Sequence, residues 1–192
     1  MGIEYISEKY HNMKMKPSLL LAFLLISSTL MAQISISFEG SKQGKFKGES
    51  QRKGFEDKSE VLGYISELNS PRDPASGMAT GKRNYLPIVI LKATGAASPM
   101  LMQAAANNEV IKKIVIDFYK RDMNGMETSY YTVTLENASI SGFKQFVGPL
   151  ENERFNPEDR TLYDEIRIVF QKITVEEKTG KTMATDDATG RY

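Results

Sequence analysis

Short runs in which apolar and polar residues alternate recur along the chain, and each run predicts a half-buried strand. In the first run, Ile34, Ile36 and Phe38 alternate with serine and glutamate. A second strand is expected over residues 61–68. Residues 85–93 contain four consecutive apolar positions, which is typical of a strand buried on both faces. The first half of the chain therefore has the pattern of a β domain.

Residues 111–119 form the next predicted strand, with its isoleucines and Phe118 on one face. Asn124 and Gly125 both tolerate a positive φ, so a type I′ turn should join this strand to residues 130–135 as a hairpin.

Two interruptions of the alternation predict where the sheet bends. Residues 137–139 break the pattern before Ile140, so a bulge or corner is expected there. Residues 163–175 form the last main strand, and their apolar set changes face midway. Such a change is expected where a sheet bends to close on itself.

One helix is predicted, and it begins at Ser98-Pro99. The Ser98 hydroxyl suits the N-cap because it can accept from the free amides of the first turn. Pro99 suits the first helical position, and Asn107-Asn108 the stop. Many short strands, one helix and no strand–helix–strand repeat predict an all-β (mainly β) barrel or sandwich with one covering helix and long inter-strand loops.

Residues 70–83 form an unusually long loop for a compact domain, because most connections have about 4–6 residues. Such a loop is either disordered or packed against something outside its own domain. Its charged residues can pair across an interface, so we expect an inter-subunit loop. The candidate residues are Ser70, Pro71, Arg72, Asp73, Pro74, Gly77, Lys82 and Arg83.

Both ends of the chain differ from the predicted domain at residues 33–178. Residues 1–32 contain Lys14 and Lys16, then an apolar block, then Ala32, which is the order of a secretory signal peptide cleaved after Ala32. In the alternative, translation starts at Met31, and the upstream residues are an over-extended start. Residues 179–192 are a small, polar C-terminal tail, expected to be mobile unless docked.

Composition excludes several chemistries. The chain has no cysteine, and its one histidine, His11, precedes the predicted domain, so that domain has no His-Cys zinc site and no Ser-His-Asp triad. The net charge of +1 leaves the domain without the electrostatic footprint of a nucleic-acid-binding protein. The one basic run is either a solvated loop or a basic rim that meets a neighbouring copy. It consists of Lys42, Lys45, Lys47, Arg52 and Lys53.

Motifs that resemble reactive sites lack the residue spacing or the fixed scaffold that such sites need. Residues 77–83 and 180–182 lack the glycine spacing of a phosphate-binding loop. Glu176-Glu177 would point to opposite faces of a strand, and Asp186-Asp187 lie in the tail. We therefore expect no catalytic residue, no cofactor and no metal.

Several blocks resemble one family in the correct order. SPRDPASG followed by TGKR, an apolar strand and ASP before a short helix resembles the Hcp family, the tube proteins of type VI secretion. KGESQRKGFEDKSEVLGY resembles the first half of the family, and KKIVIDFYKRD, YDEIRIVFQKITVE and TGKTMATDD its second half. The resemblance covers about residues 33–187.

The resemblance implies a closed β-barrel of two packed antiparallel sheets with one flanking helix. It also implies a hexameric ring, stacked into a tube that carries effector proteins in its channel, with a spike protein at the tip and a sheath around it. The family assembles in the cytoplasm and leaves through its own machine, so this route needs no signal peptide. An enzyme, a nucleic acid or a small-molecule substrate is not implied.

A second hypothesis is a secreted monomeric β-barrel that binds a small ligand, or a secreted variant derived from the tube protein. Bulky residues at the predicted interior positions indicate a filled barrel and argue against a ligand cavity.

Overall fold

The computed structural model describes residues 33–121, 125–148 and 161–188. The candidate signal peptide, Asn124 of the predicted turn, and most of the predicted connection after residue 146 lie outside these ranges. The mainly β prediction is confirmed. The elements are β1 (Ile34–Gly40), β2 (Gly44–Lys45), β3 (Ser59–Val61), β4 (Gly63–Ile65), β5 (Leu68–Asn69), β6 (Asn84–Tyr85), β7 (Ile88–Ala93), α3 (Ser98–Ala106), β8 (Ile111–Arg121), β9 (Glu127–Val147), β10 (Leu162–Val169), β11 (Lys172–Glu177) and β12 (Thr182–Asp187).

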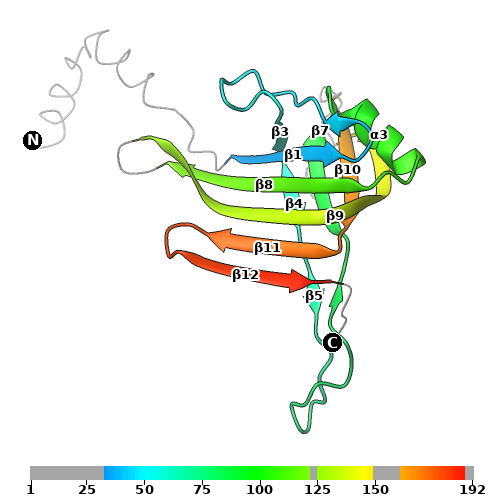
Figure 1. The fold of residues 1–192 in the computed structure, drawn as a ribbon, viewed down its shortest axis with the longest axis vertical. Coiled ribbons are helices and arrows are strands. Elements are labelled where there is room, and N and C mark those ends of the chain that lie inside the picture. Colours follow the sequence, from blue (N-terminus) through cyan, green and yellow to red (C-terminus); the bar gives the residue numbers. More distant parts are fainter. Residues whose placement is uncertain (1–32, 122–124, 149–160, 189–192) are drawn as a thin grey trace, which may run out of the picture. The chain divides into compact units, whose positions relative to one another are not determined.

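The main sheet has two parts that share strand β9. In the first sheet the order is β2-β1-β8-β9-β11-β12, and in the second it is β9-β10-β7-β4, with antiparallel pairing throughout. Figure 1 shows β1, β8, β9, β11 and β12 side by side, with β7 and β10 crossing their direction and α3 at one end. The predicted hairpin of residues 111–119 and 130–135 is β8–β9.

A corner in β9 passes the chain from one sheet to the other. Asn137 has φ 49°, a left-handed conformation that asparagine tolerates better than most residues. Pairing with β8 ends at Ala138, and pairing with β10 begins at Ser139. The predicted corner at residues 137–139 is therefore confirmed.

The predicted last strand, residues 163–175, is in fact two strands. β10 pairs with the second half of β9, and β11 pairs with its first half, on either side of Phe170-Gln171. The change of apolar face thus marks the point where the chain switches sheets. Residues 182–187 of the predicted tail form β12, which pairs with β11 along its whole length, so this part of the tail is docked.

The segment of β3 and β4 connects the first sheet to the second a second time. β3 pairs with β1, β4 pairs with β7, and Leu62 between them donates its amide to the Leu91 carbonyl at 2.8 Å. One continuous segment therefore touches both sheets, while full barrel closure stays a prediction. The predicted strand of residues 61–68 is broken into short pieces because it turns from one sheet to the other.

The core lies between the two sheets and under α3. Its fully buried side chains are mostly isoleucines, and Phe46, from a segment predicted to be a solvated loop, is only 1% exposed. Helix α3 buries Leu101 and Ala104, and Asn107 is its C-cap as expected. Among the described residues, no helix is long and apolar enough to cross a membrane.

The start of α3 differs from the prediction. Its N-cap is Ala97, which has no side-chain capping bond, and Pro99 lies in the first turn one position later than expected. Glu49 contacts this end of the helix: its Oε1 accepts from the amide of the N-cap residue Ala97 at 3.0 Å. A distant loop thus supplies a partner at the helix end, which no local pattern predicts.

Ser98 instead belongs to a buried polar cluster. Its hydroxyl accepts from the Gly95 amide at 2.9 Å and donates to Asp164. Asp164 and Lys92, opposite each other on β10 and β7, are 0% exposed, with 3.3 Å between Nζ and Oδ2. Burial alone would raise the pKa of Asp164, but hydrogen bonds from Ser98, Gln145 and Thr94 lower it below its usual value.

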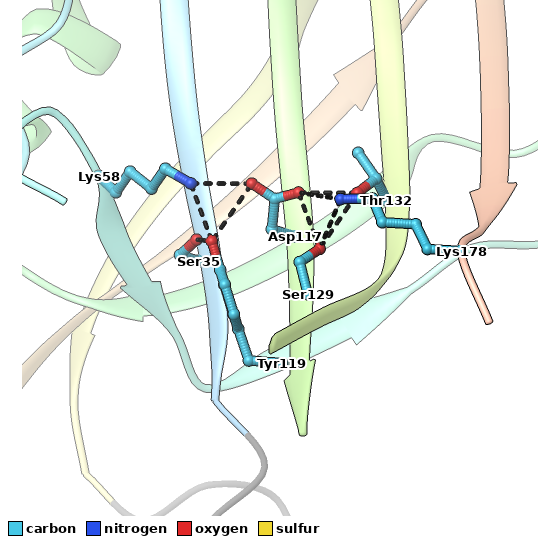
Figure 2. Close-up of polar contacts among 7 residues, drawn as sticks. All are labelled: Ser35, Lys58, Asp117, Tyr119, Ser129, Thr132 and Lys178. Carbon is cyan, nitrogen blue, oxygen red and sulfur yellow. Dashed lines mark hydrogen bonds and ion pairs between the residues drawn. The ribbon is translucent and has the colours of Figure 1, made fainter. Parts of the chain in front are cut away.

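A second polar cluster lies on the first sheet (Figure 2). The Asp117 carboxylate accepts from Lys58 Nζ at 2.8 Å and from Thr132 Oγ1 at 2.7 Å. Lys58 also donates to the Tyr119 hydroxyl at 2.9 Å. Burial opposes the charged form of Asp117, yet these donors hold its pKa below the usual value. Asp117 thereby fixes the loop that carries Lys58 over the sheet.

We expect Ser98→Ala to lower the free energy of unfolding by about 1–3 kcal/mol, because Asp164 loses a donor and the Gly95 amide loses its acceptor. Urea unfolding measures this change. Ser70→Ala, at an exposed serine, is the control and should match the parent. A Ser98→Ala curve that superimposes on the parent would show that the cluster contributes nothing.

We expect Asp117→Asn to lower the free energy of unfolding at neutral pH by about 2 kcal/mol, since two charge-assisted hydrogen bonds weaken. The hydrogen bonds to Asp117 hold its folded pKa below that of an unfolded aspartate, so its stabilisation is complete above the unfolded pKa of about 4. It is lost as the pH falls through the folded pKa. Urea unfolding from pH 7 to 3 should show parent and variant converging in acid, while Asp57→Asn, at an exposed site, stays parallel to the parent.

Candidate functional site

The predicted loop of residues 70–83 is the distal end of a long hairpin that continues β4 and β7. We call residues 66–87 the arm. Its two legs pair as β5–β6, and the Leu86 amide donates to the Glu67 carbonyl at 3.0 Å. Farther out, the Thr80 amide donates to the Pro71 carbonyl at 3.1 Å. The arm therefore carries its own backbone hydrogen bonds. In Figure 1 it extends past the end of β12.

The tip of the arm is a tight turn built by three of the candidate residues. Asp73 accepts from the Ala75 amide at 2.7 Å, which is the main reason that its pKa is lowered. Gly77, with φ 69°, donates its amide to the Asp73 carbonyl at 2.8 Å, and Arg72 donates to the Gly77 carbonyl at 3.2 Å. Arg72 and Asp73 thus shape the turn within the chain, and their contacts across an interface stay a prediction.

The rest of the arm surface is exposed. Met78 at the tip is 71% exposed, and Leu68 on one leg is 48% exposed. Ile65, where the arm leaves β4, is 62% exposed. The other candidate residues of the distal arm are exposed as well: Ser70, Pro71, Pro74, Gly77 and Lys82. These exposed apolar side chains stand on an ordered projection, where they are available to pack against another protein.

Arg83 and Tyr85 anchor the root of the arm to strand β12. Arg83 Nε donates to Asp186 Oδ2 at 2.7 Å and its Nη2 to Oδ1 at 2.5 Å, while the Tyr85 hydroxyl donates to Oδ2 at 2.9 Å. Burial and the hydrogen bond to Asp186 raise the pKa of Tyr85 to about 12. Burial opposes the charge of Asp186, but Arg83 and Tyr85 lower its pKa. Arg83, predicted to pair across an interface, is thus engaged within the chain.

Sequence reasoning missed Asp186 and Tyr85. The Asp186-Asp187 pair was visible, but it was assigned to a tail without a scaffold. Alternation in residues 182–187 is weak, because five of the six β12 residues are exposed. The available signal was the match of that tail to a late block of the family resemblance.

The basic run is exposed at Lys42, Lys45, Lys47, Arg52 and Lys53. Arg52 forms an ion pair with Glu127 and lies 4.5 Å from the Phe55 ring centroid. The Lys42 amide donates a hydrogen bond to Glu109 Oε1 at 2.7 Å. Exposure fits both a solvated loop and a rim that meets a neighbouring copy.

Cavities near the basic run offer little for catalysis. Two open cavities of about 290 and 260 Å³ flank Phe55 and Lys58. The Lys58 amine that both share is already bound by Asp117 and Tyr119. Within the described ranges, no group of three His, Cys, Asp or Glu side chains could hold a metal ion. The arm is therefore the stronger candidate for a functional site.

Comparison with known proteins gives one consistent family. The family model described as "Type VI secretion system effector, Hcp" matches residues 36–176. The major exported protein of Pseudomonas aeruginosa is 32% identical over 164 residues, covering 79% of this chain and 92% of the relative.

Solved structures agree with the sequence comparisons. A crystal structure of an Hcp protein superposes with a TM-score of 0.72 at 22% identity, covering 82% of this chain and 98% of that chain, which shows the shared fold. The secreted protein Hcp3 from Pseudomonas aeruginosa gives a TM-score of 0.65 at 26% identity over the same shares. Since the family model spans most of the described domain, this chain belongs to the Hcp family of type VI secretion proteins.

Proposed function

We propose that the chain is a structural tube subunit of a type VI secretion system, with six copies closed into a ring and the rings stacked. Membership of the Hcp family supports this role. The observation that carries it is the arm, which is ordered by internal bonds and exposes Leu68 and Met78. A head-to-tail contact made by such an arm can repeat from copy to copy and close into a ring or extend a stack.

Order within the arm matters for this role. A disordered loop must lose its conformational freedom when it binds, and that loss opposes association. The Asp73 turn, the β5–β6 pair and the Asp186 anchor restrict this arm before any partner arrives. Preorganisation therefore leaves more of the contact energy for assembly.

The other partners follow from the family role. We infer that effector proteins occupy the channel, a spike protein caps the tube and a sheath surrounds it. The chain acts as a structural component without catalysis, cofactor, nucleic acid or small-molecule substrate. The near-neutral charge supports the exclusion of nucleic acid.

The alternative, a secreted monomeric barrel with a ligand inside, has less support. The space between the sheets is filled by side chains that are fully buried, such as Ile36, Ile90 and Leu135. The open cavities lie beside the loop of Phe55, at the surface. A secreted, tube-derived variant would share this fold and differ in whether its rings stack.

Removal of the distal arm should abolish stacking and leave the fold intact. Asn69 and Asn84 already lie opposite each other, so an Asn-Gly turn in place of residues 70–83 closes the hairpin without changing its register. We expect an unchanged β-rich circular dichroism spectrum and the loss of stacked rings in electron micrographs. Normal stacks would refute the role of the arm.

A point variant refines this test. Met78→Ser should weaken the arm contact about 10- to 100-fold, because a buried methionine contributes about 1.5–3 kcal/mol. Met102→Ser on α3, also at an exposed methionine, is the matched control. If both substitutions weakened assembly equally, the tip of the arm would have no special role in the contact.

The route of export has its own test. If residues 13–32 act as a signal peptide, Lys14→Glu with Lys16→Glu should strongly reduce the protein in the periplasm and medium. Lys9→Glu, upstream of the expected start, should change nothing. Equal amounts of exported protein from the double variant and the parent would favour a start at Met31 and ejection from the cytoplasm.

A further inference from the structure

Apart from the backbone that continues β4 and β7, the root of the arm is tied to the rest of the fold by side chains. β5 and β6 form a separate two-stranded sheet that pairs with no other described strand. Pro87, at the end of the arm, has no amide to donate and separates β6 from β7. The direction of the arm therefore depends on what holds Arg83 and Tyr85.

Both residues are held by one carboxylate on the edge of the first sheet. Asp186 lies opposite Ile173, which is buried, so its side chain points to the same face as the core. It is the only residue of β12 that is partly buried. Arg83 donates from two nitrogens to the Asp186 carboxylate and from one of them to the Asp187 carbonyl at 3.2 Å. The centroid of the Tyr85 ring lies 5.2 Å from that of the Phe170 ring.

We propose that β12 is a clamp for the arm and that Asp186 is its positioning residue. The two-pronged contact with Arg83 fixes orientation as well as distance, because the guanidinium and carboxylate planes must match. Together with the bond from Tyr85, it sets the angle at which the arm leaves the second sheet. This role rests on the proposed function, in which the arm meets a neighbouring subunit.

The clamp couples two surfaces. β12 is an edge strand that pairs only with β11, and its other edge has no partner strand among the described residues. A neighbour that binds the oriented arm also stabilises β12 on β11, and a neighbour that binds β12 also orients the arm. By linkage the two effects have the same size. Contacts at the arm and at the sheet edge therefore reinforce each other.

Hydrogen exchange of the full chain tests the clamp. Asp186→Asn should speed amide exchange in residues 70–83 by about tenfold, because charge-assisted bonds at the root are lost. Glu176→Gln is the control: it removes one carboxylate charge at an exposed position on the adjacent strand β11. Variants are compared in equally dilute samples, with light scattering alongside, so that their assembly states match.

Two further variants separate positioning from general stability. Tyr85→Phe keeps the ring contact with Phe170 and loses one hydrogen bond. Amide exchange in residues 70–83 should therefore speed up less than in Asp186→Asn. Arg83→Lys keeps the charge but loses the planar fork, so its effect should approach that of Asp186→Asn. Exchange in core strands such as β8 should stay at the parent rate in all of them.

The outcomes distinguish the clamp from the proposed function. Faster exchange in the arm, together with slower assembly, supports both. Faster exchange with normal rings and stacks supports the clamp and contradicts the contact role of the arm. Parent-like exchange in the arm of Asp186→Asn, or an equal increase in Glu176→Gln, would overturn the clamp.

Discussion

Strand β9 is the constraint on which the rest of the structure depends. One of its edges pairs with β8, and the other pairs with β11 and β10 in turn. The corner at Asn137 lets a single strand serve both sheets. Every other main strand takes its place relative to this one, so the hairpin β4–β7, and with it the arm, is positioned through β10.

Three aspartates then tie distant segments to this frame. Asp117 on β8 holds Lys58, Asp164 on β10 holds Ser98, and Asp186 on β12 holds Arg83. Each carboxylate has a lowered pKa because the donors outweigh the cost of burial. All three are therefore charged at neutral pH. The sheets supply the scaffold, and these carboxylates decide where the loop, the helix and the arm lie on it.

Local pattern was enough for the positions of the main strands and the corner, because alternation and residues 137–139 act within a few positions. It could not find the partners of a helix end: Ser98 suits a cap by its local sequence, yet its hydroxyl belongs to the Asp164 cluster, and the amide of the N-cap residue Ala97 donates to the distant Glu49. It also missed β12 and Asp186, since an exposed edge strand has almost no apolar periodicity. For the arm, length and turn residues predicted a functional segment, while its hairpin bonds and its anchor depend on pairs distant in sequence.

The central claim is that copies of this chain assemble through a preorganised arm. Light scattering coupled to size exclusion, on the purified full chain at rising concentration, tests it most directly. The account predicts a species with six times the subunit mass, which grows into larger stacks as the concentration rises. A monomer mass that persists at high concentration would contradict it.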